Sequence, residues 1–195
     1  MCIRDRDRSG PISREGRAFS SEAMLDFSKL SVRENFDSTQ KKLVEELPMA
    51  VNPVVGGEKI EDLPGESYYC PSQSKLEISR VSFATKKITE EAISLSRASW
   101  KNWSLKSVAD RVSIVRKISQ IMRENRMALT ALISLEVGKN AVEADADFCE
   151  AVDFCEYYAD EMERLSKPIK MGDALGENNQ YSYRSKGPVA VISPW

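Results

Sequence analysis

The residue types most able to do chemistry gather in one acidic run, Glu143–Leu165. Its acids recur every three or four positions, a spacing that places them on one face of a helix: Glu143, Asp147, Glu150 and Asp153. Carboxylates held this close can bind a divalent metal ion. The alternative is a solvated helix face. We favour the second, because the chain has no histidine and its Asp145–Asp147 stretch lacks the glycine and the closing glutamate of a calcium-binding loop.

Four cysteines are the other candidates for chemistry, and none is in a CxxC pair: Cys2, Cys70, Cys149 and Cys155. The start of the chain has no secretion signal, so we expect a reducing compartment and free thiols. Cys149 and Cys155 are six positions apart, about 240° round a helix, and therefore face different directions. Neighbouring acids raise a thiol pKa, the opposite of what a reactive thiolate needs. We expect Cys155 in the core and Cys149 in a structural role, rather than a redox role for either.

Composition excludes several classes of function. The 28 basic and 30 acidic residues give a net charge of -2, which offers no field to hold nucleic acid or an anionic membrane. Without histidine there is no Ser-His-Asp triad, no Cys-His pair and no ordinary zinc site. No window approaches the roughly 18 consecutive apolar residues that span a bilayer. We therefore expect a cytoplasmic protein with no metal and with neither nucleic acid nor membrane as partner.

The first residues have the composition of a leader rather than of a folded domain. Their arginines faintly suggest a mitochondrial transit peptide, but Asp5, Asp7 and Glu15 interrupt the run, and such peptides are poor in acids. We treat residues 1–25 as a disordered or non-native leader and expect the fold to begin at Asp26.

The elements that must position the acidic run start with a helix. Apolar spacing predicts it over Val32–Glu46, with Ser31 as its N-cap. Val54–Ile60 then reads as a hairpin around Gly56 and Gly57, and Leu76–Ala84 alternates as a strand does. The first third of the chain is therefore predicted to be a helix followed by small β elements.

The middle of the chain is predicted to be helical. Thr89 is the expected N-cap of a helix over residues 89–102, and Ser104 or Ser107 caps the next one. Helical spacing continues over Met127–Val137, where Gly138 is the expected C-cap. The last helix covers Ala141–Leu165, because Pro168 stops it.

The end of the chain changes character again. Gln180–Arg184 alternates around two tyrosines, and Val189–Ile192 is an uninterrupted apolar run. A run with no polar face belongs in a sheet covered on both sides, usually a parallel one, and such a sheet needs partner strands that this chain does not supply. The run indicates an α/β fold that is truncated.

Three stretches together resemble the aldehyde dehydrogenase superfamily: ISLEVGK (Ile133–Lys139), EADADFCEAVDFCEYYA (Glu143–Ala159) and GPVAVISPW (Gly187–Trp195). The resemblance covers residues 26–195. Within the superfamily the chain looks like the branch that oxidises glutamate semialdehyde, the open form of 1-pyrroline-5-carboxylate. That branch includes free-standing enzymes and the carboxy-terminal half of proline utilization proteins.

The resemblance implies an aldehyde dehydrogenase-like fold. Residues 26–178 would form its amino-terminal helix-rich part, and residues 179–195 an oligomerisation hairpin and the first strand of a Rossmann-type NAD domain. The loop after that strand would bind the NAD cofactor, through Ile192, Ser193, Pro194 and Trp195. This family binds cofactor without GxGxxG, a motif that the chain also lacks.

The resemblance also assigns one substrate contact, since Glu150 in the EAVDF motif matches a glutamate that touches substrate in this branch. The solvated-face reading stays open beside it. The catalytic Cys and Glu of the family lie beyond Trp195, so no catalytic residue is expected here. The implied function is NAD-dependent oxidation of glutamate semialdehyde, a small aldehyde, by a homo-oligomer. The alternatives are another branch, such as one acting on succinate semialdehyde, or a non-catalytic assembly module.

Overall fold

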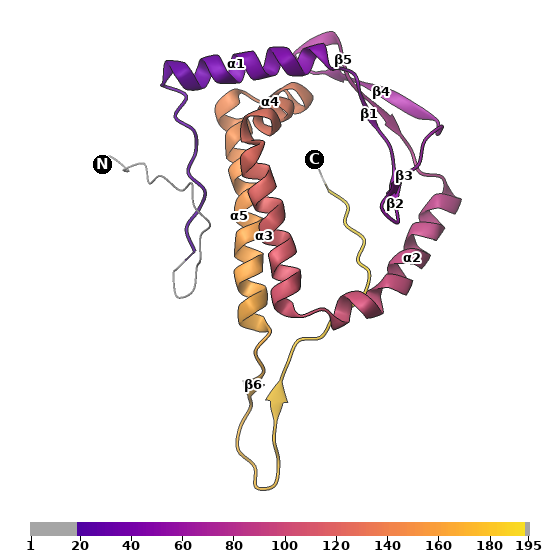
Figure 1. Cartoon of the computed structure of the whole chain (residues 1–195), viewed down its shortest axis with the longest axis vertical. Helices are drawn as coiled ribbons and strands as arrows, with labels where there is room; N and C mark the ends of the chain where they lie inside the picture. Colours follow the sequence, from indigo (N-terminus) through magenta and orange to yellow (C-terminus); the bar gives the residue numbers. More distant parts are fainter. Residues whose placement is uncertain (1–18, 194–195) are drawn as a thin grey trace.

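A computed structural model describes residues 19–193, so the cofactor predictions for Pro194 and Trp195 and most of the predicted leader lie outside the described residues. The architecture is a group of packed helices joined to a small mixed sheet (Figure 1). The order of elements is helix, small strands, four helices and a terminal hairpin. No helix in the described part is long and apolar enough to cross a membrane.

The helical part consists of α3 (Val108–Glu124), α4 (Arg126–Val137) and α5 (Ala141–Leu165). In Figure 1, α3 and α5 run side by side. One core cluster lies where the three helices meet: Phe148, Cys149 and Val152 of α5, packed by Met122, Leu129 and Ile133. Phe148 and Val152 belong to the series of apolar residues, three or four positions apart, that predicted the helix Ala141–Leu165, and the bounds of this helix are confirmed.

The mixed sheet has the order β1-β5-β4. The central strand β5 (Gln73–Ser82) pairs parallel with β1 (Met49–Val51) and antiparallel with β4 (Gly65–Cys70). The strand predicted over residues 76–84 is therefore confirmed, although it begins three residues earlier and ends two earlier. The sequence prediction missed β1 and β4, because every side chain of β4 except Cys70 is exposed and leaves no alternating apolar pattern.

A second core cluster ties the sheet to the helices. Cys70, Ile78 and Leu135 are buried together, and partly buried leucines pack against them: Leu43, Leu47 and Leu76. These residues come from α1 (Leu30–Glu45), from β4 and β5, and from α4. Helix α1 thus lies across one end of α4 and closes this side of the molecule (Figure 1).

The helix caps test the predicted boundaries. Ser31 is not a cap, since α1 begins at Leu30 after Lys29, which makes no side-chain cap bond. The prediction of Thr89 as an N-cap is also wrong. Thr85 caps α2 (Lys86–Leu105) by accepting a hydrogen bond from the Ile88 N–H. Ser107 does cap α3, and Gly138 ends α4 at a φ of 76°, in the left-handed region where glycine is favoured.

The remaining strands form two small hairpins. Strands β2 (Val54–Val55) and β3 (Glu58–Lys59) pair antiparallel, which confirms the predicted hairpin. Strand β6 (Ile169–Lys170) pairs antiparallel with β7 (Gln180–Tyr181) at the end of the molecule opposite α1 (Figure 1).

Beyond β7 the chain is extended and runs back along α2. The Trp100 indole Nε1–H donates to Ser185 Oγ over 2.7 Å, which fastens this segment. The apolar run Val189–Ile192 pairs with no strand of residues 19–193, and its side chains are exposed, Ile192 by 92%. The run is not a strand in the described structure, and its place in a nucleotide-binding sheet stays a prediction.

Candidate functional site

An open groove of about 580 Å³ lies between α5 and residues 19–24. Aromatic side chains line much of it: Phe19, Phe154, Tyr157 and Tyr158. Edge-to-face packing of Phe19 on Tyr157, with ring centroids 5.4 Å apart, joins its two sides. Acidic residues face it as well: Glu22, Asp147, Glu150 and Asp153. The groove therefore combines apolar surface with negative charge.

Glu150 is the acid whose carboxylate is available in this groove. Its side chain is exposed on α5 and makes no hydrogen bond or ion pair with any other residue of the range 19–193. An ionised carboxylate is an acceptor only, so it suits the N–H groups of an ammonium ion. The structure places Glu150 where a bound molecule can reach it.

The other three acids of the predicted helix face differ from Glu150 in their contacts or their position. Asp147 forms an ion pair with Lys139, and Asp153 accepts a hydrogen bond from the Glu22 N–H at 2.7 Å. Glu143 is exposed and lies outside the groove. No group of three or more His, Cys, Asp or Glu within residues 19–193 is arranged to hold a metal ion. The solvated-face interpretation thus holds for Glu143 and fails for Asp147 and Asp153, which bind protein groups.

Of the two cysteines of α5, Cys149 lies in the core, which is the position expected for Cys155. Cys149 is buried in the helical core cluster, whereas Cys155 is only partly buried. The reason is that Cys149, Phe148 and Val152 share the face of α5 that meets the other helices. Burial raises the pKa of Cys149 to about 11, against the opposing effect of Arg126. Burial also raises the pKa of Cys155. Neither is a reactive thiolate near neutral pH.

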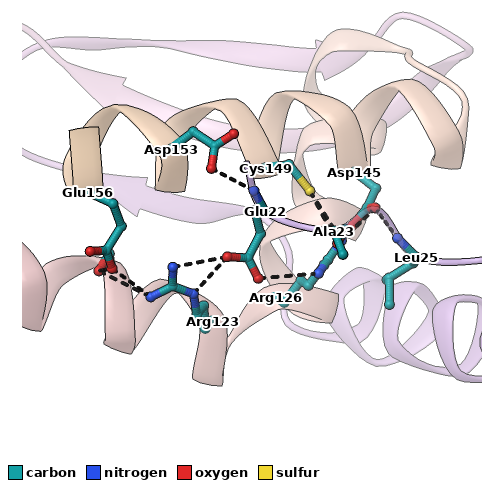
Figure 2. Close-up of polar contacts among 10 residues, drawn as sticks. Glu22, Ala23, Leu25, Arg123, Arg126, Asp145, Cys149, Asp153 and Glu156 are labelled. Atoms are coloured by element: carbon teal, nitrogen blue, oxygen red, sulfur yellow. Dashed lines mark hydrogen bonds and ion pairs between the residues drawn. The ribbon is translucent and has the colours of Figure 1, made fainter. Parts of the chain in front are cut away.

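Residues 19–25, which the sequence prediction assigned to the leader, are part of the folded structure. Figure 2 shows them lying along α5. The Leu25 N–H donates to Asp145 Oδ2 at 2.7 Å, and the Ala23 carbonyl accepts a weak bond from the Cys149 thiol at 3.8 Å. The leader prediction is therefore wrong for this stretch, because two acids of α5, the buried Asp145 and the partly buried Asp153, accept its backbone N–H groups.

Glu22 is a residue of the groove lining that the sequence prediction missed. Its carboxylate contacts Arg123 of α3 at 3.0 Å and Arg126 of α4 at 3.9 Å (Figure 2). Arg123 also donates to Glu156 at 2.8 Å. Burial lowers the pKa of Arg123, but the hydrogen bonds that Arg123 donates to Glu156 and Glu22 outweigh it and hold that pKa above its usual value. The sequence signal available for this contact was the spacing of Arg123 and Arg126, three positions apart. That spacing does not indicate which acid they bind.

Of the predicted cofactor residues, Ile192 and Ser193 fall within the part of the chain that the structure describes. They lie in the exposed extended segment, and neither lines the groove. Their exposed side chains offer a nucleotide no enclosed surface.

Comparison with known proteins identifies the family. The family model described as the aldehyde dehydrogenase family matches residues 64–195. The chain is 33% identical over 177 residues to a 1-pyrroline-5-carboxylate dehydrogenase of Oceanobacillus iheyensis, covering 91% of this chain and 34% of the relative. It is 34% identical over 180 residues to the Staphylococcus aureus enzyme of that name, with the same coverage. The chain thus spans about a third of the length of these relatives.

Solved structures agree. Proline utilization A of Bdellovibrio bacteriovorus superposes with a TM-score of 0.84 at 34% identity, covering 87% of this chain and 18% of that one. A Thermus 1-pyrroline-5-carboxylate dehydrogenase with bound NAD gives a TM-score of 0.79 at 28% identity, covering 84% of this chain and 32% of that one. The resemblance seen in the sequence and its implied fold are confirmed. With its family match over residues 64–195, the chain belongs to the aldehyde dehydrogenase family.

Proposed function

We propose that the protein containing this chain oxidises L-glutamate 5-semialdehyde, the open form of 1-pyrroline-5-carboxylate, to glutamate with NAD. The names of its relatives support this substrate, and the NAD bound in the Thermus relative supports the cofactor. In this proposal the chain supplies the helical frame and one face of the substrate site. A cytoplasmic location remains part of it.

The observation that carries the proposal is the exposed carboxylate of Glu150 in a groove lined by aromatic rings. The substrate is an amino acid, so it has an ammonium group as well as an aldehyde. A carboxylate beside aromatic faces binds such a cation, because ion pairing and cation–π attraction act together. We assign Glu150 to this substrate contact. It binds and orients the substrate, while the reacting groups of the family come from outside this chain.

The cofactor and assembly roles follow from the ends of the described chain. We assign Ile192–Trp195 to the loop that lines the NAD site once the apolar run Val189–Ile192 has partner strands. The β6–β7 hairpin carries unpaired strand edges, which can pair with a second copy, so we propose a homo-oligomer.

The experiment uses the protein encoded by the uninterrupted reading frame that contains this chain. Reduction of NAD is followed with glutamate semialdehyde and with succinate semialdehyde, which has no ammonium group. For Glu150→Ala we expect KM for glutamate semialdehyde to rise about tenfold or more, since a charge-assisted contact is lost, and KM for succinate semialdehyde to change little. Glu143→Ala is the matched control, because Glu143 is an exposed acid of α5 outside the groove. A wild-type preference for succinate semialdehyde would refute the substrate assignment.

A further inference from the structure

Residues 19–25 form an extended segment, here called the strap, that lies against the helical part without being a helix or strand itself. Two of its backbone N–H groups donate to acids of α5, from Glu22 to Asp153 and from Leu25 to Asp145, each at 2.7 Å. Both acceptors belong to α5, and their bonds are three residues apart along the strap. The strap is therefore held in one register on that helix.

The side chain of Glu22 adds a second attachment, to the other two helices. It is 12% exposed and lies between Arg123 of α3 and Arg126 of α4 (Figure 2). Each arginine has a further acid of its own: Arg123 pairs with Glu156, and Arg126 with Asp145. Removing the Glu22 carboxylate thus leaves neither arginine without a counter-charge, so the helices should stay folded while the strap loses its anchor.

The strap also forms part of the groove that contains Glu150. Four of its residues line that groove: Phe19, Ser21, Glu22 and Met24. The rest of the lining named above belongs to α5. The side chains of Phe19 and Met24 supply apolar surface on one side, and Glu150 supplies the carboxylate on the other. The width of the groove beside Glu150 therefore depends on where the strap lies.

From this geometry we propose that Glu22 is a positioning residue, which holds the strap as the second wall of the groove and thereby sets how tightly the groove accepts a substrate beside Glu150. The substrate in this statement rests on the proposed function. The anchoring of the strap does not, and Cys149 reports it separately. Cys149 is a buried residue of the groove lining, and its thiol contacts the Ala23 carbonyl of the strap.

The first measurement is thiol labelling of the native protein from the same reading frame with iodoacetamide, resolved by peptide mass spectrometry. In Glu22→Ala we expect Cys149 to label about tenfold faster or more. The reason is that the strap can then move away from the helices without the cost of breaking the Glu22 ion pairs. Cys70, which is 1% exposed in the other core cluster, should keep its wild-type rate. Glu22→Gln retains an acceptor for the arginines without the charge. Its Cys149 labelling rate should fall between those of the wild type and Glu22→Ala.

The matched control is Glu161→Ala. Glu161 is also an acid paired with an arginine, Arg164, but this pair lies within α5 on the surface and outside the groove. Its loss should leave the labelling of Cys149 unchanged. Unchanged Cys149 labelling in Glu22→Ala overturns the proposal, and so does equal acceleration of Cys149 and Cys70, which would make Glu22 a residue of global stability.

The second measurement separates KM from kcat. In Glu22→Ala we expect KM for glutamate semialdehyde to rise about fivefold or more with kcat within about twofold, since the groove binds substrate but holds no reacting group. Faster Cys149 labelling with an unchanged KM would reduce the strap to a structural element and overturn its role as a wall. If the wild-type protein does not oxidise glutamate semialdehyde, the proposed function fails, while the labelling of Cys149 still decides whether Glu22 holds the strap.

Discussion

Arg126 and Asp145 meet in a two-point contact that joins α4 to α5. The arginine Nε and Nη2 donate to the two carboxylate oxygens at 2.8 and 2.7 Å, and Asp145 is fully buried. The same carboxylate accepts the Leu25 N–H, so one acid binds a helix and the strap together. Such bidentate pairs fix geometry as well as charge.

The first prediction concerns this contact. Asp145→Asn should lower the free energy of unfolding by about 3–5 kcal/mol, because Arg126 loses a buried partner and keeps only the distant Glu22 carboxylate. Urea unfolding followed by circular dichroism measures the effect. Glu161→Gln removes the charge of an exposed pair and should lower the free energy of unfolding far less. Similar losses in the two variants would contradict the importance given to Asp145.

The second prediction concerns the sheet. A Cβ added at Gly65 would lie 2.4 Å from the Val81 carbonyl oxygen, so the backbones of β4 and β5 would have to move apart. Gly65→Ala should cost about 1–3 kcal/mol of stability. Glu66→Ala, on the next and exposed position of the same strand, is the control and should be nearly neutral. Thermal unfolding of the two variants compares them directly, and a neutral Gly65→Ala would show that the strands are not in close contact there.

The third prediction is a pH dependence that comes from Cys149. Its pKa is raised to about 11 in the folded protein from 9.0. The folded state therefore holds the proton more tightly, and this contribution to stability is complete below pH 9 and is lost as the pH rises toward 11. Wild-type protein should lose about 1–2 kcal/mol more than Cys149→Ala between pH 8 and pH 11. Urea unfolding at a series of pH values, with the difference taken between the two proteins, isolates this thiol. Parallel curves would contradict its burial.

The fourth prediction concerns the segment after β7. Ser185→Ala removes the acceptor of the Trp100 indole N–H, an exposed contact worth about 0.5–1.5 kcal/mol. We expect faster amide exchange in residues 182–193 and no change in α3 or α5. Hydrogen exchange followed by mass spectrometry tests this. Ser182→Ala is the matched control, because Ser182 is an exposed serine of the same segment and is not the acceptor of the Trp100 indole N–H. Equal exchange in the two variants would mean that the indole contact does not fasten the segment.

Local sequence pattern was enough to predict the helices. Apolar spacing that includes Phe148 and Val152 predicted α5, and Pro168 marked where it stops. Gly138 marked the end of α4, because such signals act within one or two helical turns. The exposed strand β4 has no such signal, since its side chains contact little and its pairing with β5 is made through backbone groups.

The site was harder to predict, because its contacts join residues that are far apart in the chain. Glu150 was found through a motif, and its exposure in the groove agrees with the proposed role without testing it. Glu22 was assigned to a charged leader, since its bond partner Arg123 is 101 positions away and no local periodicity links them. Only the packing of α3, α4 and α5 brings these charges together.

The strap is synthesised before the helices on which it lies, yet it needs them to take its final position. The partners of its Glu22 side chain and backbone come 101 and 131 residues later. At about 5–20 residues per second, a ribosome takes roughly 5 to 25 seconds to add that length. During this interval the carboxylate is hydrated and has neither arginine to bind. Among residues 19–193, one of the earliest parts to leave the ribosome must therefore be among the last to take its final position.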